Sequence, residues 1–130
     1  MKTNELSLAI RKFALSGEIP TWLNEDYFYI NLHTSEPLSA SEHLPQYTGY
    51  KPVKVARSSV SHSVGSSEIT VDVQFPANRD KGVTVELKYY SISIGQNFMA
   101  YKNEIPDGGI TLTSGHAPYF ESESLRILEK

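Results

Sequence analysis

The chain has 130 residues, the size of one domain that can bury a core without covalent staples. It contains no cysteine, which excludes disulfides, thiolate metal sites and thiol nucleophiles and is typical of a reducing compartment. Twelve basic and fifteen acidic residues give a net charge of -3, and no cluster of Lys and Arg is interleaved with aromatic residues, so nucleic acid is not an expected partner.

The N-terminal segment, residues 4–16, is predicted to form a short amphipathic helix. Leu6, Ile10 and Phe13 follow the i, i+4, i+7 spacing of one helix face, and the charged residues mostly lie elsewhere. The capping candidates are Thr3 or Asn4 at the start and Gly17 at the end. The helix is expected to lie on the end of a β-sandwich, and the alternative is that it docks on another subunit.

Neither a membrane span nor a standard secretion signal is predicted. No apolar run approaches the roughly 20 residues that cross a bilayer, and Glu5, Arg11 and Lys12 interrupt the first apolar residues. Trp22 follows in a loop, where an aromatic ring fills a gap in the core or, less often, forms a binding hot spot.

Residues 26–37 contain an aromatic strand that runs into a polar turn. Phe28, Ile30 and Leu32 alternate with polar and tyrosine positions, so the strand has one apolar and one wettable face. Pro37 ends it, because proline lacks the N–H that strand pairing requires. The connection that follows, residues 34–49, is longer than most loops inside a compact domain and is the first candidate for an interaction element.

The rest of the chain is predicted to be strands and turns. The slip in alternation near Tyr89 and Tyr90 indicates a β-bulge. Residues 58–67 are expected to be a flexible hairpin tip, with a short strand and turn as the alternative. The predicted strands are 50–57, 68–75, 83–94, 98–101, 110–112 and 122–128, with turns at 95–97 and 107–109. This pattern predicts a mainly β protein: one antiparallel, jelly-roll-like β-sandwich domain over residues 1–130, with strands over 26–128.

No catalytic, cofactor-binding or metal-binding residue is predicted, and an enzyme is not expected. The four histidines have no metal-ligand spacing and are expected at the surface or in turns. The chain has no G-x-S-x-G elbow, no phosphate-binding loop and no supported pair of catalytic carboxylates. The eight Tyr and five Phe are more informative about function than the absent catalytic motifs. Tyr covers the outer faces of sheets and also anchors protein interfaces.

The order of motifs resembles that of a family of small tailed-bacteriophage virion proteins, known as tail-fibre-like or decoration proteins. In that family a short helix precedes a strand that ends in L-H-T-x-[DE]-P, which is Leu32 to Pro37 here. An acidic residue, a Gly-Tyr pair, a strand ending in F-P and three further strands then follow in the family's order. The corresponding positions are Glu42, Gly49 and Tyr50, Phe75 and Pro76, 83–92, 98–101 and 110–112.

The resemblance implies a non-enzymatic structural protein of a phage particle, made in the host cytoplasm. The main expectation is a capsid cement or decoration subunit that binds the major capsid protein and possibly other copies of itself. The alternatives are a tail-fibre or baseplate-associated protein and, outside that class, a carbohydrate-binding module. The residues predicted to form the contact surface are Leu6, Ile10, Phe13, Trp22, His33, Pro37, Glu42, Pro45, Tyr47 and Tyr50.

Overall fold

The computed structural model describes residues 1–95 and 98–128, apart from the side chains of Arg126 and Leu128. It is mainly β, with 35% strand and 13% helix, antiparallel sheets and one α-helix at the N-terminus, which confirms the predicted fold class. The predicted turn at Gln96 and Asn97 lies outside the described residues. No helix among the described residues has the length and apolar character needed to cross a membrane.

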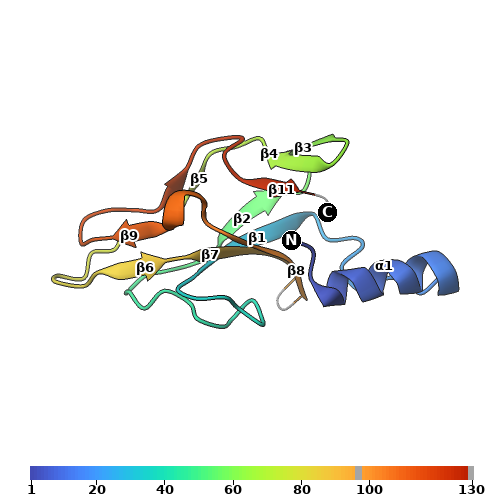
Figure 1. Cartoon of the computed structure of the whole chain (residues 1–130), viewed down its shortest axis with the longest axis horizontal. Helices are drawn as coiled ribbons and strands as arrows, with labels where there is room; N and C mark the ends of the chain where they lie inside the picture. Colours follow the sequence, from blue (N-terminus) through green and yellow to red (C-terminus); the bar gives the residue numbers. More distant parts are fainter. Residues whose placement is uncertain (96–97, 129–130) are drawn as a thin grey trace.

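A four-stranded antiparallel sheet forms one layer, in the order β2-β1-β7-β8 (Figure 1). Its strands are β1 (Tyr27–His33), β2 (Val53–Ala56), β7 (Tyr89–Ile94) and β8 (Phe98–Glu104). Phe28, Ile30 and Leu32 of β1 are buried in the core, as the alternation predicts, and Ile30 lies opposite Ile92 of β7.

The second layer consists of three smaller antiparallel sheets. The pairings are β11-β4-β3, β10-β5 and β6-β9. The strands are β3 (Val60–Ser63), β4 (Ser66–Ile69), β5 (Val73–Gln74), β6 (Val85–Leu87), β9 (Ile110–Leu112), β10 (Tyr119–Phe120) and β11 (Arg126–Leu128). Side chains from both layers, among them Phe75, Leu87 and Phe120, join those of β1 in one hydrophobic core.

One long hairpin bends from the four-stranded sheet into the second layer. Lys88 separates β6 from β7, and its N–H donates to the carbonyl of His33 at 2.9 Å. The slip predicted near Tyr89 and Tyr90 therefore occurs one residue earlier. A 3-10 turn, η1 (Pro106–Gly108), makes the same bend between β8 and β9, and a register shift lies at Ile92/Ser93.

Two predicted segments differ from the structure. Residues 58–67 include β3 and the start of β4, joined by a tight turn at Gly65, so the structure favours the alternative of a short strand and turn over the preferred flexible tip. The strand predicted over 68–75 breaks between β4 and β5, and Val71 is 40% exposed instead of lying in the core. The break arises because the segment changes partners, from β3 and β11 to β10.

The helix α1 (Asn4–Ser16) is anchored to β8 at its start. Thr3 caps it, accepting the Leu6 N–H at 3.2 Å, and the Thr3 backbone N–H donates to Ala100 of β8 at 2.9 Å. Leu6 is the buried residue of α1, and the rest of the helix extends away from the sheets (Figure 1). The expectation that α1 lies along the end of the sandwich is therefore wrong beyond its first turn.

Candidate interaction surfaces

His33 fastens the long loop to the four-stranded sheet. Its side chain is completely buried, so the expectation that all four histidines lie at the surface is wrong here. The Nδ1 atom lies 2.6 Å from the Glu42 carbonyl oxygen and Nε2 lies 2.7 Å from Ser91 Oγ. Since a carbonyl only accepts, Nδ1 carries the proton and donates, and Nε2 accepts from the Ser91 hydroxyl.

This arrangement requires a neutral imidazole. Burial lowers the pKa of His33, outweighing the opposing effect of its hydrogen bond to the Glu42 carbonyl. On the other side, Asn31 Nδ2 donates to the hydroxyls of Ser91 and Ser93 at 3.2 and 3.1 Å. At Asn31 and His33 the polar face of β1 is thus buried, and these side chains form hydrogen bonds with the serine hydroxyls of β7.

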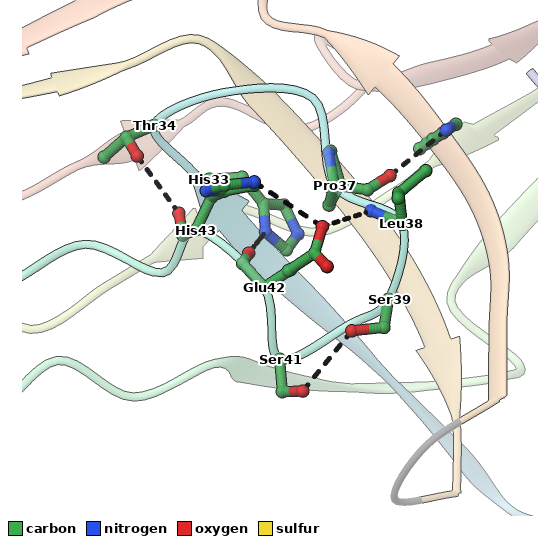
Figure 2. A network of polar contacts seen from close by, with 9 residues as sticks. His33, Thr34, Pro37, Leu38, Ser39, Ser41, Glu42 and His43 are labelled. Carbon is green, nitrogen blue, oxygen red and sulfur yellow. Dashed lines mark hydrogen bonds and ion pairs between the residues drawn. The ribbon is translucent and has the colours of Figure 1, made fainter.

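The first part of the loop closes on itself (Figure 2). The Thr34 backbone N–H donates to the His43 carbonyl at 2.8 Å, which joins the two ends of a ten-residue turn. The Thr34 hydroxyl donates to the same carbonyl at 3.3 Å (Figure 2). Inside that turn the Glu42 carboxylate accepts the Leu38 N–H at 2.9 Å. Lys102 of β8 donates to the Pro37 carbonyl at 3.1 Å and holds the turn against the sheet.

The second part of the loop is fastened to the rest of the sandwich. The Tyr47 hydroxyl donates to the Pro76 carbonyl at 2.7 Å, and Asp80 accepts the Thr48 N–H at 2.8 Å. The Tyr50 hydroxyl accepts the Leu32 N–H at 2.9 Å, and burial raises the pKa of Tyr50 to about 12, so the phenol stays protonated. Both tyrosines therefore hold the loop in place and present little ring surface to a partner.

The structure sorts the ten predicted contact residues by exposure, although it contains no partner that would test the prediction. The buried ones belong to the chain's own packing and the exposed ones stay available for contact. Leu6, His33, Pro37, Pro45 and Tyr47 are buried, Trp22, Glu42 and Tyr50 are partly buried, and Ile10 and Phe13 are 44% and 47% exposed.

Sequence reasoning missed the most exposed apolar side chains of these two regions. Leu38, at the crest of the loop, is 72% exposed, and Leu15 and Ile19, in and after α1, are 83% and 67% exposed. Leu38 gave no signal because it lies in an irregular segment without periodicity. Leu15 was detectable, since it falls outside the face that Leu6, Ile10 and Phe13 share.

A groove of about 310 Å³ runs between α1 and the segment that returns from it. Leu8 and Ala9 line one side and Ile19 lines the other. Trp22 and Phe98 also line the groove, with ring centroids 5.5 Å apart and planes tilted by 41°. Trp22 is thus half-buried against Phe98 in the wall of the groove, and among the described residues it is outside the hydrophobic core whose gap it was expected to fill.

In the described part of the chain, the side chains that could bind a metal ion are dispersed and the buried polar side-chain atoms are paired. Among residues 1–95 and 98–128, no group of three or more His, Asp or Glu side chains is placed to hold a metal ion. Every buried side-chain nitrogen and oxygen in the same residues has a hydrogen-bond partner. The most exposed apolar side chains of the two candidate surfaces are Leu38 in the long loop and Leu15 in α1.

No protein-family model matches this chain, and no curated protein matches its sequence. The class of protein is therefore defined by structure alone. It is a small antiparallel β-sandwich with a tightly held surface loop and a protruding, partly apolar N-terminal helix.

Proposed function

We propose that this protein is a structural subunit of a bacteriophage particle that binds the outside of the capsid shell as a cement or decoration protein. The support is the resemblance centred on Leu32 to Pro37 together with the role these residues play. His33 and Thr34 hold the loop closed, and Pro37 is buried beneath it and bound to Lys102. The motif thus fastens the loop to the four-stranded sheet, which supports a role for the loop in contacts.

The observation that carries the proposal is the fixed presentation of Leu38. An exposed apolar side chain on a loop tied down by at least six hydrogen bonds loses little conformational entropy when it docks. A single contact of this size is weak. On a shell with many equivalent positions, however, weak contacts from many copies add up to substantial reinforcement.

Binding to tails is the nearest alternative, because fold alone does not determine which virion component a sandwich contacts. A sugar-binding role has less support. The Trp22 ring lies against Phe98 instead of standing free as a platform, and Tyr47 and Tyr50 are used internally.

The test is co-sedimentation of the purified protein with shells of its own phage that lack it, compared with tails. Deleting the loop would remove the buried Tyr47, so the sharper variant is Leu38→Glu, which changes only the crest. We expect saturable binding to shells, weakened about tenfold or more by Leu38→Glu, a loss of about 1.4 kcal/mol. Val64→Glu is the matched control, since Val64 is fully exposed at the distant β3–β4 turn.

Binding to tails alone, or to neither particle, would overturn the capsid proposal. Shell binding that Leu38→Glu and Val64→Glu leave equally strong would keep the capsid location and refute the role of the loop crest.

A further inference from the structure

Beyond its first turn, α1 exposes apolar side chains on more than one side. Leu8 and Ile10 are 45% and 44% exposed, Phe13 is 47% exposed and Leu15 is 83% exposed. At 100° per residue, Leu8 and Leu15 fall on one side of the helix and Ile10 and Phe13 on the opposite side. A helix that is apolar on several sides is normally buried, and contiguous exposed apolar patches mark interaction sites.

The charges on one side of α1 indicate which partner fits. Glu5, Leu8 and Arg11 follow one another at three-residue spacing, so the leucine lies between an acid and a base on one face. Glu5 and Arg11 are both exposed, and neither forms an ion pair within the described residues. Lys12, by contrast, pairs with Glu18 at 3.9 Å.

This pattern is complementary to itself. When two copies of α1 run antiparallel about a two-fold axis at Leu8, Glu5 of each copy lies opposite Arg11 of the other. The two Leu8 side chains meet at the axis, and the opposed helix dipoles add a small favourable contribution. A two-fold axis makes both halves of such an interface identical, so one unpaired acid and one unpaired base on each helix satisfy all four charges.

We propose that α1 is a self-association arm that pairs antiparallel with α1 of a second copy of this chain. An antiparallel pair uses one face of a helix of 13 residues, which is fewer than the roughly 20 to 30 residues a side of a standard interface. The dimer is therefore expected to be weak and concentration-dependent, with a Kd of the order of micromolar. This inference goes beyond the proposed function and does not depend on it, because pairing requires no shell.

The test is sedimentation velocity of the purified protein over about 1 to 300 μM, a range that brackets a micromolar Kd. We expect a monomer–dimer equilibrium that Glu5→Arg and Arg11→Glu each weaken at least about fivefold, since each places two like charges opposite each other. The double swap Glu5→Arg/Arg11→Glu should restore dimerisation. Arg79→Glu is the matched control, because Arg79 is exposed far along the chain and makes no ion pair within the described residues.

Far-UV circular dichroism keeps the result interpretable by showing that each variant retains α1. Leu8→Glu, which places two carboxylates at the axis, should abolish dimerisation. A wild-type protein that stays monomeric throughout the range would overturn the proposal. A dimer that the single swaps leave intact, or that the double swap fails to restore, would overturn it as well. None of these outcomes bears on shell binding, which co-sedimentation tests separately.

Discussion

At the scale of single residues, Gly109 is the glycine least able to accept a side chain. Its φ of 97° and ψ of -167° belong to a region that only glycine adopts readily, and a Cβ there would lie 2.3 Å from the Leu87 carbonyl oxygen. Gly109→Ala should therefore lower the free energy of unfolding by about 3 kcal/mol. Gly108→Ala is the control, since φ is 82° but nothing lies within 4 Å, and about 1 kcal/mol is expected. Urea unfolding measures both, and equal losses would contradict the steric argument.

His33 makes a residue-scale prediction about pH. Its folded pKa is lowered by burial, so the unfolded chain takes up the proton first as the pH falls below about 6.5. Stability from this group is complete above that pH and is lost towards the lowered folded value, by at most about 1.4 kcal/mol per pH unit. His33→Gln should flatten this part of the pH–stability curve, measured by urea unfolding between pH 7 and 5. The exposed neighbour His43 provides the control, and a curve that only His43→Gln flattens would refute the assignment.

The buried state of His33 also shows what single-residue reasoning misses. Histidine without a ligand pattern is usually at the surface, and nothing near His33 in the sequence indicates Ser91, which lies 58 residues away. The partner becomes apparent only when β1 and β7 pair. Strand alternation did place Phe28, Ile30 and Leu32 correctly, because that property depends on local period alone.

At the scale of elements, the sequence predicted the helix caps, but it did not predict where a strand changes its pairing partner. Thr3 and Gly17 bound α1 as expected, because a cap is a local hydrogen bond or a local φ value. The split of the predicted strand 68–75 depends instead on partners from distant segments. Glu123, in the opposing segment, has a φ of 68°, and its N–H donates to the Ile69 carbonyl oxygen. The backbone irregularity beside the split strand therefore lies in that opposing segment, and the alternation of residues 69–75 does not reveal it.

The direction of α1 was unpredictable for a related reason. Periodicity shows which face of a helix is apolar, but not how far the sheet beneath it extends. Leu6 is buried, whereas Ile10 and Phe13, which share its face and its apolar chemistry, are 44% and 47% exposed. The amphipathic pattern of α1 therefore predicts a buried face and leaves open which molecule buries it.

At the scale of the whole molecule, the structure predicts two tiers of stability. The central strands β1 and β7 pair on both sides and carry side chains that are largely buried, so their amides should open only with global unfolding. Past its first turn, α1 has no buried side chain, and a free helix of 13 residues is marginal in water. In a dilute, monomeric sample, amides 8–16 should exchange through openings of about 1 to 2 kcal/mol, against about 5 kcal/mol or more for β1 and β7. Hydrogen exchange followed by mass spectrometry measures both segments in one experiment.

At high concentration the protection of α1 should rise while β1 and β7 stay unchanged, and Arg11→Glu should remove that rise. If α1 in the dilute sample were as protected as β7, the helix would be an integral part of the sandwich and the two-tier description would be wrong.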